Sequence, residues 1–198
     1  FSWTLPGGST FLILLIIVFF ARFGLIGYYS FFTLYLREEF GCDSPGFLWM
    51  IGPLAEIPLL FFSDAIIRRI GARALFALGV AGIATRLLGY AFAPSIAWII
   101  PLQALHALTF AATHTSTLHY VHRLAPPRLK QTANTLLTTF AIGLPAVCAS
   151  ALGGWLIERH GFRFMYGTYG TIALAALAAL LLFLPKPPNM PNDTPESE

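Results

Sequence analysis

Four long apolar runs of this sequence each contain an ionisable side chain in their central part, namely Arg22, Glu56, Arg86 and His106. A carboxylate can take up and release a proton, and an imidazole can accept or donate a hydrogen bond. A guanidinium stays charged and can hold a carboxylate through two parallel hydrogen bonds. These residue types point to proton exchange and to binding of a polar solute, so we expect neither an enzyme nor a cofactor.

Residues 97–121 form an apolar run that also carries polar side chains. At about 100° per residue, a helix places several of them within a sector of roughly 80°. They are Gln103, His106, Phe110, His114 and Thr117, with Thr113 beside them. Polar groups that share a face at bilayer depth usually look into a protein interior or a water-filled cavity. Each could instead only hydrogen-bond a neighbouring helix, but a shared stripe favours a binding site.

The composition is that of an integral membrane protein. The 198 residues are 57% hydrophobic and 11% charged, whereas soluble proteins contain about 25% charged residues. Apolar runs of about 20 residues can cross a hydrocarbon core of about 30 Å as helices. The net charge of +3 comes from basic residues in short loops, so the predicted partner is a lipid bilayer and not nucleic acid.

The apolar runs predict an all-α fold, a bundle of six transmembrane helices. We expect these helices at 11–36, 47–67, 73–93, 97–121, 131–157 and 163–184. We interpret residues 1–10 as the end of a cytoplasmic linker and the proline-rich, acidic residues 185–198 as a disordered cytoplasmic tail. Because the sequence begins with Phe1, we expect it to be a piece of a longer protein.

Lysine and arginine are unevenly distributed between the connecting segments. Those after the second and fourth helices, with the tail, contain Arg68, Arg69, Arg73, Arg123, Arg128, Lys130 and Lys186. Those after the first, third and fifth helices contain Arg37, Arg159 and Arg163. Since positive charge marks the cytoplasmic side, both chain ends are predicted to be cytoplasmic, in a cell membrane.

Glu56, Arg86 and His106 are predicted to meet near the membrane midplane. At about 1.5 Å per residue they lie roughly 10–15 Å from the outer ends of their helices, a depth typical of transporter binding sites. A carboxylate there costs about 2.5–3.5 kcal/mol unless it is protonated or paired, which suits a proton carrier. Arg86 either pairs structurally with Glu56 or holds a carboxylate of the substrate, and Gln103 can bond substrate oxygens.

Small residues share the face of Arg86 on the third expected helix, at Gly79, Gly82 and Gly89. Small residues let helix backbones approach closely in a membrane. We therefore expect a tightly packed helix interface from which the Arg86 side chain projects.

Four stretches carry a resemblance to a known family: LWMIGPLAEIPLLFFSDAIIRRIGAR, ATRLLGY, PLQALHALTFAATH and LAPPRLKQTANTL. Over residues 11–184 the sequence resembles the C-terminal six-helix half of a major facilitator superfamily transporter. Within it, the sequence is most similar to the phenylpropionate permease-like branch, a relative of lactose permease and the oligosaccharide–proton symporters. The resemblance implies one half of a twelve-helix fold, whose N-terminal six-helix half is missing here.

The resemblance also implies roles for individual residues. Glu56 and Arg86 match a charged pair that contributes to sugar binding in lactose permease, and His106 matches its substrate-site histidine. Thr109 and Gln103 depart from that pattern, because they stand where lactose permease has an acid and a lysine. The proton route of lactose permease therefore does not carry over unchanged, and the proton would sit on Glu56, on a histidine or in the other half.

Cavity residues are implied for the first helix as well. Arg22, Tyr28 and Tyr29 stand where the phenylpropionate branch places polar and aromatic cavity residues. With these residues, the sequence predicts the second half of a secondary transporter that couples proton entry to symport of a small organic solute. An aromatic monocarboxylate is the expected substrate, and a sugar or a nucleoside is the alternative.

Other functional classes explain fewer of these features. A metalloenzyme would use the histidines of one segment, His106, His114, His119 and His122, but their spacing scatters them around a helix, so no metal site is expected. A channel would need a filter motif, which the sequence lacks. A non-transporting membrane subunit, or a truncated and inactive half-transporter, stays open as an alternative of another class.

Overall fold

The structure is a computed structural model that describes residues 8–187. Its helices are α1 (Gly8–Phe40), α2 (Gly46–Ile70), α3 (Ala72–Phe92), α4 (Ile96–Ala104), α5 (Thr113–Leu124), α6 (Lys130–Thr138), α7 (Leu144–His160) and α8 (Phe162–Phe183). Two π-helical segments, η1 (Ala107–Ala112) and η3 (Thr139–Gly143), join α4 to α5 and α6 to α7. A short 3-10 turn, η2 (Pro127–Leu129), precedes α6.

Six helical spans within residues 8–187 are long and apolar enough to cross a membrane, which confirms the expected six-helix, all-α fold. The fourth span comprises α4, η1 and α5, and the fifth comprises η2, α6, η3 and α7. The helices extend a few residues past most of their expected ends. Residues 8–10, expected in a linker, are helical. The remainder of that linker and residues 188–198 of the expected tail lie outside the described residues.

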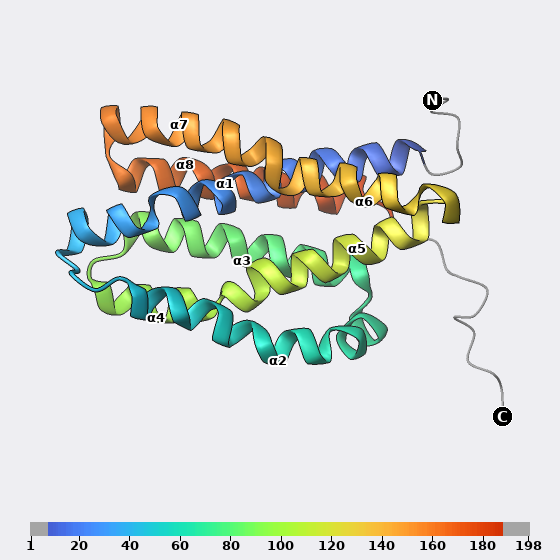
Figure 1. The fold of residues 1–198 in the computed structure, drawn as a ribbon, viewed down its shortest axis with the longest axis horizontal. Helices are drawn as coiled ribbons and strands as arrows, with labels where there is room; N and C mark the ends of the chain where they lie inside the picture. Colours follow the sequence, from blue (N-terminus) through green and yellow to red (C-terminus); the bar gives the residue numbers. More distant parts are fainter. Residues whose placement is uncertain (1–7, 188–198) are drawn as a thin grey trace.

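Successive spans run in opposite directions through the bundle, so α1 begins and α8 ends at the same end (Figure 1). Gly71 and Gly161 adopt φ angles of 82° and 83° between α2 and α3 and between α7 and α8. Glycine is the residue that adopts positive φ without a steric cost, so these two helical hairpins turn within one residue. The tight turns place α3 beside α2 and α8 beside α7.

The buried core of the bundle has two apolar clusters that meet on α1. One cluster contains the buried residues between Leu14 and Ala21 of α1, together with Phe76 and Leu180. The other cluster contains Phe23 of α1, together with residues of α3 and α8. Arg22 lies between them, and it is only 3% exposed. Buried polar side chains gather near this junction: Arg22, Arg86, Gln103, His106, Thr109 and Thr113. Buried polar side chains therefore gather where the two apolar clusters meet.

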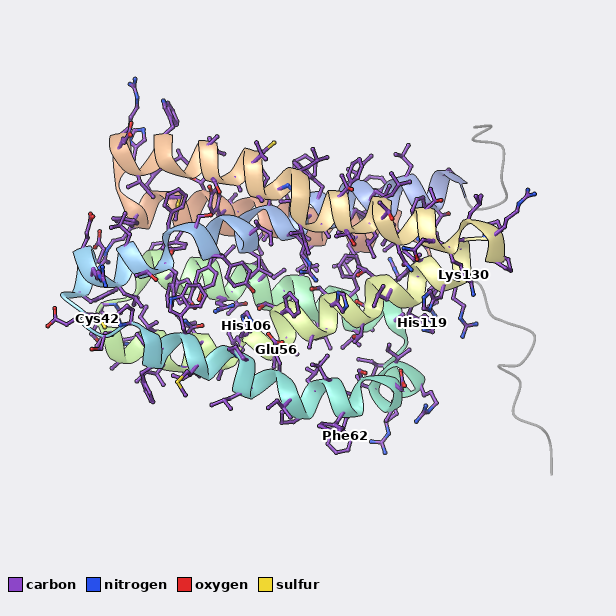
Figure 2. All side chains as sticks on the ribbon, in the orientation of Figure 1. Cys42, Glu56, Phe62, His106, His119 and Lys130 are labelled. Carbon is purple, nitrogen blue, oxygen red and sulfur yellow. The ribbon has the colours of Figure 1, made fainter. Side chains whose placement is uncertain are left out.

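Helix α2 lies at the edge of the bundle and exposes apolar side chains. Its exposed residues include Leu54, Ile57, Phe61 and Phe62, and Phe62 points away from the other helices (Figure 2). A surface of this kind is suited to lipid tails or to another apolar surface. Glu56 lies on the same helix but points towards His106 in the bundle (Figure 2).

Candidate functional site

The Arg86 guanidinium is enclosed by hydrogen-bond acceptors on three spans. Its Nε donates to the Tyr90 hydroxyl at 2.8 Å, and Nη1 reaches His106 Nδ1 at 2.7 Å and Thr109 Oγ1 at 3.3 Å. Its Nη2 donates to the Tyr28 hydroxyl at 2.9 Å and to Gln103 Oε1. A guanidinium has five N–H donors, so each donor of Arg86 has an acceptor within the protein.

His106 joins the arginine to the glutamate. Its Nε2 lies 2.5 Å from Glu56 Oε1, while its Nδ1 faces Arg86 Nη1. Because a guanidinium can only donate, Nδ1 must accept, and the neutral imidazole then carries its proton on Nε2. His106 therefore donates to the Glu56 carboxylate, and a positive and a negative charge are connected through a neutral ring.

This arrangement corrects one interpretation of the sequence. A direct structural pair of Glu56 with Arg86 was considered above, but among the described residues the short contact of Glu56 is a hydrogen bond from the neutral His106 ring. The three groups come from α2, α3 and the span that contains α4 and η1. The imidazole ring fills the space between them, so the two charged groups communicate through it.

Close approach of helix backbones brings His106 to this position. A Cβ at Gly52 of α2 would lie 3.0 Å from His106 Cγ and Cδ2, so the absence of a side chain makes room for the ring. On α3, a Cβ at Gly79 would lie 2.6 Å from Thr113 Cγ2, and one at Gly82 would lie 3.2 Å from Leu108 Cβ. The tightly packed interface expected on the face of Arg86 is confirmed.

Aromatic rings form a wall beside the polar network. Arg86 Cζ lies 4.5 Å from the ring centroid of Tyr28 and 5.6 Å from that of Tyr90, distances at which a cation is attracted to a ring face. Tyr29 is half-buried, stacks on Trp49 and meets His106 edge to face, each with centroids 6.0 Å apart. The wall offers flat apolar surface next to hydrogen-bonding groups.

Arg22 has a different environment on α1. Its Nη2 donates to Thr113 Oγ1 at 3.0 Å, and its Cζ lies 5.1 Å from the Phe110 ring centroid. The Phe110 ring stacks between His106 and His114, with centroid distances of 6.0 and 5.8 Å. The ring stack places Arg22 next to the segment that carries His106.

The polar stripe expected on residues 97–121 continues across the π-helical segment, because His106, Phe110 and His114 stack one after another on the same side. Thr109 and Thr113 are fully buried, whereas His114 is exposed. Gln103 and His106 join the Arg86 network, Thr113 binds Arg22, and the Thr117 hydroxyl donates to the Thr113 carbonyl at 2.7 Å.

The sequence did not single out several residues of the site. Tyr90 and Trp49 are aromatic residues in apolar runs, where they are usually packing residues, and only their positions in space connect them to the network. Thr109 was noted as a departure from the family pattern, and here it accepts a hydrogen bond from Arg86. Among residues 8–187, no three His, Cys, Asp or Glu side chains lie close enough to hold a metal ion.

The chain matches a protein-family model and several named permeases. A family model described as the MFS_1 like family matches residues 4–168. A maltose permease from Geobacillus stearothermophilus is 29% identical over 148 residues, which are 74% of this chain and 38% of the relative. A melibiose permease from Enterobacter cloacae subsp. cloacae is 30% identical over 134 residues, 68% of this chain and 32% of the relative.

A third relative carries a different substrate in its name. The probable 3-phenylpropionic acid transporter of Escherichia coli is 26% identical over 95 residues, 48% of this chain and 25% of the relative. This chain spans about a third of the length of the curated permeases that it matches. These relatives are named as permeases and transporters, so the expectation of a protein that is not an enzyme is confirmed.

Proposed function

This chain belongs to the MFS_1 like family, and from that membership we propose that it forms half of a proton-coupled transporter for a small organic solute. Alternating access in this class of fold requires two helix bundles that rock around a site at their interface. The described bundle supplies one of them, and a second six-helix bundle supplies the other. We place the protein in a cell membrane with both ends of this bundle at the cytoplasmic side, where lysine and arginine are concentrated.

The proposal of proton coupling rests on the chain of hydrogen bonds that links the side chains of Glu56, His106 and Arg86. A proton added to His106 would occupy Nδ1, which faces the cationic Arg86 at 2.7 Å. Two donors cannot share that contact, so protonation of His106 would separate α3 from the span that carries the histidine. A proton added to Glu56 instead removes the negative charge that balances Arg86. Either step links proton uptake to a rearrangement of the helices.

We propose an aromatic monocarboxylate as the solute. The half-buried pair of Tyr29 and Trp49 offers a flat apolar surface beside His106, and stacking on such rings favours a ring-bearing solute. The name of the 3-phenylpropionic acid transporter that resembles this chain is consistent with this class. His114, which is exposed and stacks on the Phe110 ring, contributes to binding of this solute.

A sugar is the second candidate, because maltose and melibiose permeases are among the relatives. Glu56 is 14% exposed, so one carboxylate oxygen can accept a hydrogen bond from a sugar hydroxyl while the other holds His106. A sugar would stack its apolar face on the same Trp49 ring. The two candidates differ in charge, and that difference can be measured.

Uptake into proteoliposomes tests the proposal. The full-length protein that carries this chain would be reconstituted and supplied with radiolabelled 3-phenylpropionate, melibiose or a nucleoside, with and without an inward proton gradient. We expect gradient-driven accumulation of 3-phenylpropionate and its loss in Glu56→Gln. Accumulation of melibiose alone would favour the sugar, and no accumulation of any solute would favour the non-transporting subunit.

A further inference from the structure

Arg22 is a buried cation whose donors are largely unused. The residue is 3% exposed, and its hydrogen bond to Thr113 is the one that it forms with the described residues. None of its nitrogen atoms is a fully enclosed atom without a partner, so the unused N–H groups border accessible surface. No acid among residues 8–187 forms an ion pair with it.

An unpaired guanidinium in a membrane-spanning helix is costly. Charged groups at that depth face the bundle interior or a water-filled cavity, pair with one another or with backbone carbonyls, and mark the paths of substrates and ions. The ring of Phe110, whose centroid lies 5.1 Å from Arg22 Cζ, offsets part of this cost through a cation–ring contact. Glu56 is a described acid whose negative charge acts on Arg22, but its short contact is with His106, so the guanidinium of Arg22 stays open to a further anion.

Arg86 is not available to bind a solute carboxylate. Each of its five N–H donors already has a protein acceptor, and the residue is 1% exposed. A solute carboxylate would have to displace two of these acceptors before it could bind. Arg86 therefore fits the role of a positioning residue that fixes His106, Gln103 and the two tyrosines.

We propose that Arg22, together with Thr113 and the Phe110 ring, is the binding subsite for the carboxylate of the transported solute. This inference rests on the proposed transport function and adds the location of the charged end of the substrate. A guanidinium fork can hold a carboxylate through two charge-assisted hydrogen bonds. The ring stack of His106, Phe110 and His114 then places the bound carboxylate next to the histidine that contacts Glu56.

The charge selectivity of binding tests this assignment. Binding of 3-phenylpropionate and of its neutral amide, 3-phenylpropionamide, would be measured by titration calorimetry on the full-length protein in detergent. We expect the unaltered protein to prefer the acid, and Arg22→Gln to weaken acid binding by about tenfold or more through loss of a charge-assisted pair. Binding of the amide should stay the same, so the preference for the acid is lost.

Two further variants sharpen the test. Arg22→Lys keeps the charge but lacks the planar fork, so it should retain part of the preference. Arg163→Gln removes an exposed arginine that is paired with Glu39 at 3.1 Å and should leave the preference unchanged. A preference for the acid that survives in Arg22→Gln overturns the assignment, as does a failure of the unaltered protein to bind 3-phenylpropionate.

The same variant distinguishes a carboxylate of the solute from a carboxylate elsewhere in the protein. If an acid of the rest of the protein neutralised Arg22, Arg22→Gln would lower the melting temperature and leave the preference for the acid intact, which would overturn the proposal. Because these measurements use no proton gradient, they are independent of coupling. Loss of acid binding in Arg22→Gln without any gradient-driven uptake would retain the subsite and reject the proposed symport.

Discussion

Two arginines lie deep in the bundle, 1% and 3% exposed, and their surroundings differ. Arg86 on α3 donates to five acceptors from three spans, and two tyrosine rings cover its guanidinium. Arg22 on α1 has a threonine hydroxyl and one phenylalanine ring. The burial of the two side chains is nearly the same, but the number of satisfied donors is not.

From this difference we infer a structural role for Arg86 and a functional role for Arg22. A buried charge whose donors are all satisfied resists change, because removing it leaves its acceptors unpaired. A buried charge with free donors stays available to a ligand. The position of an arginine in a membrane helix therefore says less about its role than the acceptors around it.

Replacing Arg86 should have the largest effect on the folded state. Arg86→Met would leave Gln103, Tyr28 and His106 without their shared donor, and breaking a buried charge network costs on the order of 3–5 kcal/mol. Thermal unfolding in detergent should show a large drop in melting temperature. Arg163→Met, in an exposed pair, is the matched control and should cost at most about 1 kcal/mol. An equal drop in melting temperature in both variants would show that Arg86 matters no more to stability than the exposed Arg163.

The space for His106 should be nearly as sensitive. In Gly52→Ala the new Cβ would lie 3.0 Å from the imidazole, and because Glu56 and Arg86 hold the ring, overpacking should cost about 1–3 kcal/mol. Gly154→Ala is the matched control, since a Cβ there meets nothing within 4 Å. Alanine in a helix is otherwise favourable by about 1 kcal/mol. If Gly52→Ala were as stable as Gly154→Ala, the ring would not be fixed by its two partners.

Removing the partner of Arg22 should have a moderate effect on binding. Thr113→Val keeps the side-chain shape but removes the hydroxyl that accepts from Arg22. We expect the loss of about 1 kcal/mol, or roughly fivefold weaker binding of 3-phenylpropionate, with unchanged binding of the amide. Thr171→Val, at an exposed threonine of α8, serves as the control in the same titration. Equal weakening of acid and amide would show that Thr113 acts through packing.

The smallest loss of stability is expected at Arg22 itself. Arg22→Met replaces an incompletely paired buried charge with an apolar side chain of similar length, a change that is often neutral or stabilising. The melting temperature without ligand should therefore stay the same or rise, in contrast to Arg86→Met. A drop comparable to that of Arg86→Met would mean that both arginines are structural.

The sequence was sufficient to predict the elements that carry these groups. Apolar runs of membrane length gave six spans, and ionisable residues inside them marked Arg22, Glu56, Arg86 and His106 as unusual, because each is costly at that depth. The glycines at 79, 82 and 89 predicted close packing of α3, which the contacts of Gly79 and Gly82 with the fourth span confirm.

The pairing of these groups depended on geometry that the sequence does not encode locally. Whether Glu56 meets Arg86 or His106 is decided by side-chain rotamers on three spans, and the ring of His106 lies between the two charges. The regular 3.6-residue period does not reveal the π-helical turn at Ala107–Ala112, yet His106, Phe110 and His114 stack on one side of the span, as that period predicted. Tyr28 was expected as a cavity residue from the family resemblance, whereas Tyr90 is an ordinary core aromatic by type that only tertiary contacts make part of the site.

Glu56→Gln gives the most direct test of proton coupling. Glutamine can still accept a hydrogen bond from His106 Nε2 but cannot take up a proton, so binding geometry and coupling are separated. In proteoliposomes we predict that the variant exchanges external for internal 3-phenylpropionate across the membrane without a gradient. We also predict that it no longer accumulates the solute when an inward proton gradient is applied. Gradient-driven accumulation at the level of the unaltered protein would contradict the account.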